Sequence, residues 1–487
     1  MIRSWTVDVD DVIDAALPWE RGRRAPARRV PHLVLAWSFD EPDRLGEVVP
    51  VAQPTAIGRG GPLDDDPYPR TTLHQLRPGQ IVAGAPIGSA RIGRRQLLVE
   101  PRGEDAVHVR SIGPARVRVA GKQVTEATAR AGDIVEIHNA AVFLVTSRLA
   151  ELPATTAPVA SFPYGAPDPF GMIGESEIAW KLREAIAFAA QTTRHVLVLG
   201  ESGVGKELAA RAVHGLSARR DRRLIARNAA TIPEALLDAE LFGNVKNYPN
   251  PGMAERAGLI GEADESTLFL DEIGELPETC QVHLLRVLDS GGEYHRLGEA
   301  HARRSSFRLV AATNRPLEML KHDFLARFTH RIALPGLAER RDDVPLMLAD
   351  ILRRTARDNP TIAARFFERR KGEIAEPRLA PDLVVRLLRH PFTHHVRELE
   401  RLVWLALGTA DADYIGLTPA VEQELEQSAE AEVDATELDR DTIARALVEH
   451  GRSPTRTAKA LGLKNRYVLL RLLKKHGLSA SSEGDPS

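Results

Sequence analysis

A glycine-rich turn lies between an apolar strand and a helical pattern near the middle of the chain. The apolar run Val196 to Leu199 leads into Gly200-Glu201-Ser202-Gly203-Val204-Gly205-Lys206, and Leu208, Ala212 and Leu216 follow at helical spacing. Glycines let backbone N–H groups approach a phosphate, and the helix N-terminus adds positive potential. Lys206 would reach the outer phosphates as a point charge. The pattern predicts a loop that binds nucleotide phosphates.

Two acids end a second apolar strand, Leu268-Phe269-Leu270-Asp271-Glu272, about 65 residues after Lys206. A carboxylate at a strand end beside a phosphate loop is where Mg²⁺ is held. We therefore expect Asp271 to hold Mg²⁺ and Glu272 to polarise the attacking water. Glu207 follows the lysine where Ser or Thr often stands, so that position offers no hydroxyl ligand to the metal.

A third strand, Arg308 to Thr313, ends at Asn314. Strand ends line the crevice of a parallel sheet, so Asn314 is a candidate for orienting water or sensing the γ-phosphate. A plain polar turn after a strand explains this pattern equally well.

Composition bounds the class of protein. With 487 residues, the chain is expected to form three or four domains. Its net charge of −2 gives no overall signal for nucleic acid, and its one cysteine excludes a disulfide framework. No run approaches the 18 apolar residues of a membrane span, and the first residues do not read as a signal peptide. We expect a cytoplasmic protein with no membrane partner.

Short apolar strands between turn residues predict a β-sandwich over residues 31–148, after a segment 1–30 without an assigned role. The region resembles a forkhead-associated (FHA) domain. The resemblance rests on Ile57-Gly58-Arg59, on Arg91 to Gln96, on Val119 to Val124 and on Ala131 to Val135. It implies a protein partner and a phosphothreonine site holding Arg59 and Arg94. Gly93 and Ala120 stand where the family has Ser and Asn, so a sandwich that does not read phosphate stays an alternative.

A Pro- and Ala-rich stretch, residues 149–170, reads as a linker, and alternating strands and helices follow it. Residues 171–340 and 341–411 resemble the AAA+ domain and helical lid of sigma-54-dependent transcription activators. The matching motifs include Met172 to Ser176, Asp238 to Gly243, Thr267 to Leu276, Leu334 to Arg340 and Val396 to Glu400. That family also has Glu after the loop lysine. The resemblance implies an α/β P-loop ATPase that uses ATP and Mg²⁺.

The same resemblance implies further site residues. Asn228 matches the residue that holds the catalytic glutamate, and Arg397 matches a lid arginine that contacts the phosphates. Arg327 matches an arginine finger inserted into the neighbouring subunit's site, which implies a homo-oligomeric ring, expected to be a hexamer.

One family loop is changed. After Phe242-Gly243 the family carries a Gly-Ala-Phe-Thr-Gly-Ala loop that touches sigma-54, whereas this chain reads Asn244 to Gly252 with Pro249 and Asn250 in place of the Phe and Thr. Prolines fix φ and remove a donor, so the loop is stiffer and chemically different. In the lid, Phe392 to His395 replaces the family's Trp-Pro-Gly-Asn.

The C-terminal end predicts DNA binding. After an acidic linker, residues 412–434, the segment 435–478 resembles a Fis-type helix-turn-helix, and 479–487 form a tail. Between Glu437 and Leu478 there are 10 Lys or Arg and 4 Asp or Glu. Asn465 and Arg466 are candidate base readers in the major groove of double-stranded DNA. Lys464 lies beside them at the start of a predicted helix, Lys464 to His476, and Arg471, farther along it, is a candidate phosphate contact.

Three functions follow from these patterns. The first is an ATP-hydrolysing regulator of the sigma-54 activator class, bound as a ring to upstream DNA and acting on sigma-54 RNA polymerase. The second is a DNA-binding regulator in which ATP only switches assembly, and the changed loop favours it. A phosphopeptide adaptor, working through the FHA-like region, is a third.

Overall fold

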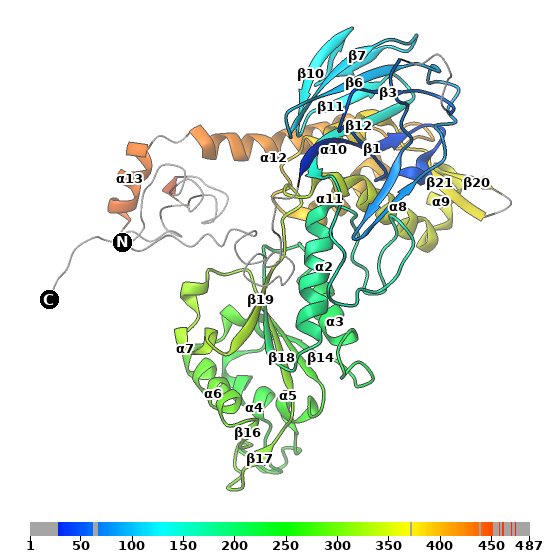
Figure 1. The fold of residues 1–487 in the computed structure, drawn as a ribbon. Coiled ribbons are helices and arrows are strands. Elements are labelled where there is room, and N and C mark those ends of the chain that lie inside the picture. The colour runs from blue at the N-terminus through cyan, green and yellow to red at the C-terminus, as the bar shows by residue number, and fades with distance from the viewer. Residues whose placement is uncertain are drawn as a thin grey trace.

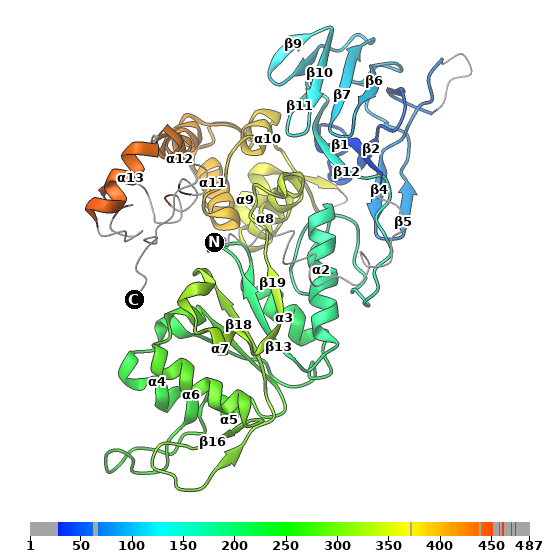
Figure 2. The ribbon, with the colours of Figure 1, turned by 60° about the vertical axis from the view of Figure 1, so that its left-hand side comes forward.

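The computed structural model describes residues 28–61, 67–370, 373–437 and 440–450, together with Thr457, Ala460, Leu461, Leu469 and Leu473. Within these residues the chain forms an antiparallel β unit, a parallel α/β unit and a group of helices that lies between them (Figures 1 and 2). None of the described helices combines the length and the apolar character that a membrane crossing requires.

The first unit consists of two antiparallel sheets, called the sandwich below. One sheet has the order β5-β4-β2-β1-β12-β11-β8-β9 and the other β10-β7-β6-β3. Valine, leucine and isoleucine side chains from both sheets form one core between them. The strands are β1 (Arg29–Ser38), β2 (Val48–Pro50), β3 (Thr55–Ile57), β4 (His74–Arg77), β5 (Gln80–Ala83), β6 (Leu97–Arg102), β7 (Ala106–Ser111), β8 (Val117–Val119), β9 (Lys122–Val124), β10 (Glu126–Arg130), β11 (Ile134–Ile137) and β12 (Ala141–Leu149).

Strands β1 and β12 are buried on both faces, which explains their nearly continuous apolar sequences. They pair antiparallel from Arg29↔Leu149 to Ser38↔Ala141. One face packs into the sandwich core, while Trp37 and Leu144 on the other join a second core with Leu346 and Met347 of the helical group. The sandwich is therefore attached to the rest of the molecule through its central strands.

The α/β unit has a five-stranded parallel sheet of order β14-β15-β18-β13-β19. This confirms the predicted P-loop sheet, with the nucleotide-facing strand ends on one edge. Its elements are α2 (Glu177–Ala190), β13 (His195–Leu199), α3 (Lys206–Gly215), β14 (Ile225–Asn228), α4 (Leu237–Phe242), α5 (Gly258–Glu262), β15 (Thr267–Asp271), α6 (Glu278–Asp289), β16 (Glu293–Tyr294), β17 (Arg303–Arg304), β18 (Arg308–Thr313), α7 (His322–Leu325) and β19 (Phe328–Ala333).

The helical group, called the lid, lies between the sandwich and the parallel sheet in both ribbon views. Its core is formed by leucines of α8, α10 and α11. The elements are α8 (Val344–Asp358), α9 (Pro360–Phe366), the hairpin β20 (Phe367–Arg370) and β21 (Glu373–Pro377), α10 (Pro381–Leu388) and α11 (His395–Thr409), and they are followed by α12 (Pro419–Glu437) and α13 (Arg440–Glu449).

Two segments with linker composition have definite structure. Residues 149–170 run along the sandwich and bury Leu152, Ala157 and Phe162, whose ring stacks on Trp180 at 5.7 Å. The acidic stretch 412–434 is largely helical because its Ala and Glu residues favour helix, and α12 buries Val421 on the lid.

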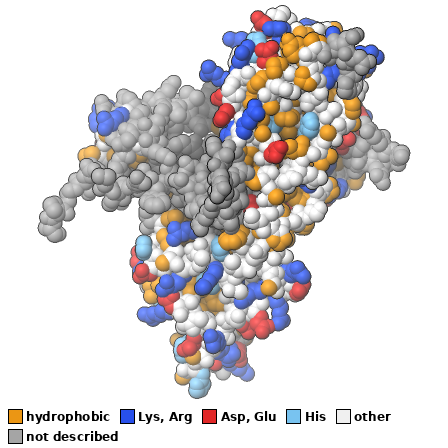
Figure 3. Space-filling model, in the orientation of Figure 1, with side chains coloured by type: hydrophobic (Ala, Val, Ile, Leu, Met, Phe, Trp, Pro, Cys, Tyr) orange, Lys and Arg blue, Asp and Glu red, His pale blue; other side chains and the backbone are white. Residues whose placement is uncertain are grey.

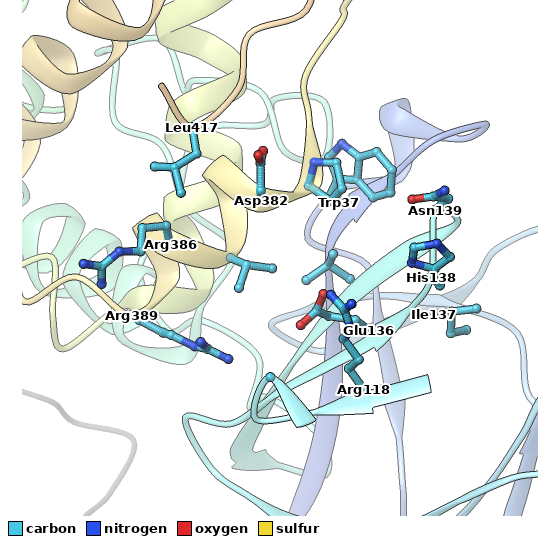
Figure 4. Close-up of a pocket in the computed structure, with 14 residues that line it drawn as sticks. Trp37, Arg118, Glu136, Ile137, His138, Asn139, Asp382, Arg386, Arg389 and Leu417 are labelled. Atoms are coloured by element: carbon cyan, nitrogen blue, oxygen red, sulfur yellow. The ribbon is translucent and has the colours of Figure 1, made fainter. Parts of the chain in front are cut away.

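A cavity of about 320 Å³ remains between the sandwich and α10. Figure 4 shows Arg386 of α10 and Arg389, which follows that helix, on one side and Arg118 and Glu136 of the sandwich on the other, below Trp37. On the face of the molecule in Figure 3, Lys and Arg are interspersed with Asp and Glu over the lower, α/β half, so the coloured residues there form no single-sign patch.

Buried histidine makes the sandwich sensitive to acid. Burial, and then the charge of Arg148, lowers the pKa of His32 to about 3. An unfolded histidine titrates near 6.5, so the unfolded chain binds the extra proton first as the pH falls. The stability contributed by neutral His32 is full above pH 6.5 and is lost progressively as the pH falls towards 3.

We expect His32→Leu to move the midpoint of acid unfolding of the sandwich, followed by circular dichroism, down by about half a pH unit. His138→Leu is the matched control, because His138 is exposed in the same sandwich. Equal midpoints for the two variants would contradict the assignment of the acid sensitivity to His32.

Candidate nucleotide site

The predicted phosphate loop connects the end of β13 to the first turn of α3. Gly203 and Gly205 have φ of 93° and 104°, values that favour glycine. A Cβ at Gly203 would also lie 2.6 Å from the carbonyl oxygen of His394, so the lid approaches too closely for a side chain there. The loop therefore presents backbone to the site, at the N-terminus of α3.

Lys206 folds back over this loop. Its Nζ donates hydrogen bonds to the carbonyl oxygens of Gly200, at 3.1 Å, and Glu201, at 3.2 Å, and lies 3.7 Å from Glu272 Oε1. The side chain is buried. The ammonium group is thus held between the loop and the acidic end of β15, where a phosphate oxygen could replace a carbonyl partner.

The acids predicted at the end of β15 lie together. Glu272 has a left-handed φ of 52°, and its N–H donates to Asp271 Oδ1 at 2.9 Å. Glu272 Oε2 is buried without a hydrogen-bond partner among the described residues. Asn228, at the end of β14, pairs in register with Asp271, but its Oδ1 accepts from the N–H of Ala230. In the described structure Asn228 therefore caps a turn and does not bind Glu272.

The donor set fits a magnesium ion that binds together with nucleotide. Asp271 offers a carboxylate ligand of the kind Mg²⁺ prefers, and the orphaned oxygen of Glu272 is left to accept a hydrogen bond from water. Glu207 pairs with Arg211 at 2.6 Å and is directed along the surface of α3. The described residues contain no cluster of three or more His, Cys, Asp or Glu that could hold a metal ion. Phosphate oxygens and water would have to complete the coordination.

The lid closes over the same loop with two side chains of α11. Arg397 Nη1 donates to Ser202 Oγ at 2.8 Å. His395 Nδ1 accepts the N–H of Leu337 at 3.2 Å, which leaves the proton on Nε2, 3.2 Å from Glu201 Oε2. The predicted role of Arg397 is compatible with this position, whereas the contact made by His395 was not expected from the sequence.

A buried pair supports this turn of the lid. His390 Nε2 lies 2.9 Å from Glu398 Oε1, and the N–H of His394 donates to Glu398 Oε2 at 2.8 Å. Burial opposes ionisation of Glu398, but these hydrogen bonds outweigh it and hold its pKa at about 2. The ionised carboxylate therefore fixes the start of α11, and with it Arg397.

Two further predicted residues, Asn314 and Arg327, belong to the same α/β unit. Asn314 follows β18 at the edge of the sheet that carries the loop, and Arg315 beside it pairs with Glu275. Arg327 follows α7, is exposed, and forms an ion pair with Asp289 on the surface. Its charge is thus presented outward and is not directed at the subunit's own phosphate loop.

The loop Asn244 to Gly252, which differs from the resembled family in sequence, is held by its own hydrogen bonds. The amide nitrogen of Asn244 donates to the carbonyl oxygens of Val245 and Ala254, both at 3.0 Å, and more weakly to that of Tyr248. The N–H of Gly252 donates to Asn247 Oδ1 at 2.9 Å, closing the tip. Tyr248 is exposed beside the tip.

Two predicted sites lie elsewhere. Arg59 and Arg94 are exposed on neighbouring sandwich loops, and the N–H of Arg59 donates to the carbonyl oxygen of Gly93 at 2.9 Å. The predicted DNA contacts Lys464, Asn465, Arg466 and Arg471 lie outside the described residues.

Comparison with known proteins shows which sequences and structures the chain is similar to. The family model "Sigma-54 interaction domain" matches residues 172–335. The chain is 33% identical over 326 residues to the transcriptional regulatory protein ZraR of Salmonella typhimurium, covering 64% of this chain and 70% of ZraR. It is 36% identical over 333 residues to the anaerobic nitric oxide reductase transcription regulator NorR of Enterobacter sp., covering 63% of each. A crystal structure of NtrX from Brucella abortus in complex with ATP matches with 26% identity and a TM-score of 0.44, covering 63% of this chain and 69% of NtrX.

A phosphate loop, a strand ending in Asp-Glu and an arginine-bearing helical lid define a P-loop NTPase of the AAA+ class. The chain belongs to the family of transcriptional regulators that carry the sigma-54 interaction domain.

We expect Lys206→Ala to weaken binding of a fluorescent ATP analogue about 10- to 100-fold, because a charge-assisted hydrogen bond contributes roughly 1.5–3 kcal/mol. Equilibrium titration would measure this. Lys122→Ala, on an exposed strand of the sandwich, is the control and should bind normally. Unchanged affinity of Lys206→Ala would exclude this loop as the nucleotide site.

Proposed function

We propose that the protein hydrolyses ATP in a homo-oligomeric ring, expected to be a hexamer, and uses the cycle to regulate transcription initiation from upstream DNA. One observation carries this proposal. The subunit gathers Lys206, Glu272 and Arg397 at one loop, whereas Arg327 is exposed on its outer surface. A neighbouring copy that inserted its own Arg327 would supply a further positive charge to this site.

The residues have distinct roles in this cycle. Backbone N–H groups from Gly200 to Glu207 and the Lys206 ammonium hold the phosphates, and Arg397 closes the lid on them. Glu272 orients and polarises the attacking water, and Asn314 contacts the γ-phosphate or that water. Bound Mg²⁺ would neutralise phosphate charge, with Asp271 as its protein ligand.

The proposed role of Asn228 depends on which of two positions its side chain takes. Its side chain lies in register beside Asp271 and now caps the turn after β14. Rotation of the amide away from Ala230 would allow it to hold Glu272 in an inactive position, so that hydrolysis starts only when Asn228 returns to its cap.

We expect Arg327→Ala to lower ATP turnover by about 10³-fold, the lower end of the range for arginine fingers, while nucleotide affinity of the isolated subunit stays the same. Arg357→Ala, on an exposed part of α8, is the control.

Mixing two inactive variants tests whether Arg327 acts in the site of a neighbouring subunit. Arg327→Ala keeps an intact water-orienting Glu272, and Glu272→Gln keeps an intact finger, so mixed rings contain some complete sites. Turnover should therefore recover in the mixture, and in wild type it should rise with protein concentration. A wild-type specific activity independent of concentration would contradict the ring.

In this proposal the C-terminal segment 435–478 binds DNA. The proposed location of the protein is the cytoplasm. Asn465 and Arg466 would read bases, with Lys464 beside them, and Arg471 would contact phosphate. The support is the local basic excess of the sequence. The other proposed units are the sandwich 31–148, the ATPase 171–340 and the lid 341–411.

The changed loop supports a second candidate, in which ATP only switches assembly on DNA. The loop Asn247–Gly252 is closed by the Asn247–Gly252 hydrogen bond and carries prolines where the family has a Gly-Ala-Phe-Thr-Gly-Ala sequence. Purified protein, sigma-54 and a transition-state mimic of ATP hydrolysis separate the two candidates.

A stable complex with sigma-54, followed by open-promoter formation with sigma-54 polymerase, would establish the first candidate and remove the second. If the protein binds DNA and turns over ATP but forms no such complex, the second candidate holds.

The sandwich loops with Arg59 and Arg94 support a weaker third candidate, a phosphothreonine adaptor. Titration with a phosphothreonine peptide against its unphosphorylated twin would test it, and equal affinities would reject it.

A further inference from the structure

Three arginines of the sandwich reach the point where the chain enters the ATPase. Arg29 of β1 forms an ion pair with Glu177 at 3.2 Å, and Arg77 of β4 donates from Nε to Glu175 Oε2 at 3.1 Å. Arg148 of β12 donates from Nη1 to the carbonyl oxygen of Glu175 at 3.4 Å. Three different strands therefore hold Glu175 and Glu177, on either side of the N-cap of α2.

The same joint is buried. The side chain of Arg148 is 3% exposed and that of Glu175 is 2% exposed. Arg148 also forms an ion pair with Asp342, at the start of the lid. Charges removed from water in this way hold their partners firmly, because separating them would leave an unpaired buried charge.

A buried carboxylate connects this joint to the lid. Asp343 is fully buried and accepts hydrogen bonds from the N–H groups of Glu175, at 2.8 Å, and Ser176, at 2.9 Å, and from Ser176 Oγ at 2.6 Å. Ser176 in turn caps α2. The start of α2 and the Asp342-Asp343 turn therefore move as one piece.

One further step reaches the phosphate loop. The N–H of Asp343 donates to the carbonyl oxygen of Arg340 at 2.9 Å. The buried guanidinium of Arg340 donates to the carbonyl oxygen of Val204 in the phosphate loop, at 3.4 Å. A continuous series of contacts thus runs from Arg148 in the sandwich, through Asp342 to Arg340, to the backbone of the nucleotide site.

The segment that connects the sandwich to the ATPase is itself hydrogen-bonded to both units. Thr156 donates from its N–H and its hydroxyl to Glu184 Oε1, at 2.8 and 2.9 Å. Tyr164 Oη donates to the carbonyl oxygen of Gly46 at 2.7 Å. The sandwich is fastened to the ATPase along this segment as well as at the three arginines.

We propose that the sandwich is a positioning element of the nucleotide site, in which Arg148, acting through Asp342 and Arg340, holds the phosphate loop in its nucleotide-binding form. Arg77 and Arg29 hold the adjoining start of α2. The sandwich in this arrangement strengthens nucleotide binding, and a ligand that loosened the sandwich would weaken it. The inference rests on nucleotide binding alone and not on sigma-54 or DNA.

The test is the nucleotide affinity of full-length Arg148→Met. We expect its dissociation constant for a fluorescent ATP analogue to rise about five- to tenfold, at the low end of couplings between distinct sites. Arg77→Met, which lies nearer the surface, should raise it in the same direction and remains informative if Arg148→Met does not fold.

Trp37→Phe is the matched control. It removes the hydrogen bond from Trp37 Nε1 to the carbonyl oxygen of Leu379, 2.8 Å, and so weakens the same sandwich–lid interface away from the arginines. It should lower the unfolding temperature and leave nucleotide affinity unchanged. A merely structural role of Arg148 would give both variants the same pattern.

Two more measurements test whether Arg148 acts on the phosphate loop through Asp342. Arg148→Met combined with Asp342→Asn should bind nucleotide no more weakly than Arg148→Met alone, because both act through one contact. By reciprocity, the ATP analogue should slow hydrogen exchange in β12 of the wild type and not of Arg148→Met. Folded Arg148→Met and Arg77→Met proteins with wild-type affinity would overturn the proposal, even if Lys206→Ala weakens binding as expected.

Discussion

The buried carboxylate of Asp343 is the constraint on which the arrangement of the three units depends. Burial, and then the charge of Asp342, raises its pKa to about 6, so its ionised form requires all its hydrogen bonds. The bond from Ser176 and the neighbouring guanidinium groups of Arg340 and Arg148 oppose that rise. The hydrogen-bond donors to Asp343 lie at the start of α2, and Asp343 itself lies directly before α8, the first helix of the lid. A shift of α2 relative to the lid would therefore break hydrogen bonds to a buried carboxylate.

The nucleotide site is divided between two of these units. The α/β unit supplies Lys206 at the start of α3 and the two acids at the end of β15, while the lid supplies Arg397 and His395 from one end of α11. The close approach of the His394 carbonyl to Gly203 shows how tightly the two parts fit. The angle between lid and sheet therefore decides whether the site is complete.

The sequence predicted the features that depend on neighbours in the chain. The strand, glycine turn and helix around Lys206 are contiguous, and so are the apolar strand and acids at Asp271; the structure places both on the expected edge. The same holds for the sandwich strands, whose short apolar runs are bounded by turn residues.

The contacts between the sandwich and the ATPase could not be predicted, because their partners lie far apart in the sequence. Arg148 and Asp342 are 194 residues apart, and Arg77 and Glu175 are 98 apart. Isolated arginines in a charged sequence carry no periodicity, and the sequence assigns no role to the segment that contains Arg29. Composition alone also misread residues 149–170, because Phe162 finds Trp180 only in the folded chain.

Helix α12 is a long helix that is attached to the lid core through its first turns. Its 19 residues extend about 28 Å at 1.5 Å per residue, and Val421 and Leu425 fasten its first turns to the lid core. Arg401 of α11 also pairs with Glu424 of α12 at 2.6 Å. A 10° rotation of α11 as Arg397 follows the phosphates would swing the far end of this rod through about 5 Å. Hydrolysis at the loop would thus be converted into a displacement of the chain that leaves α12.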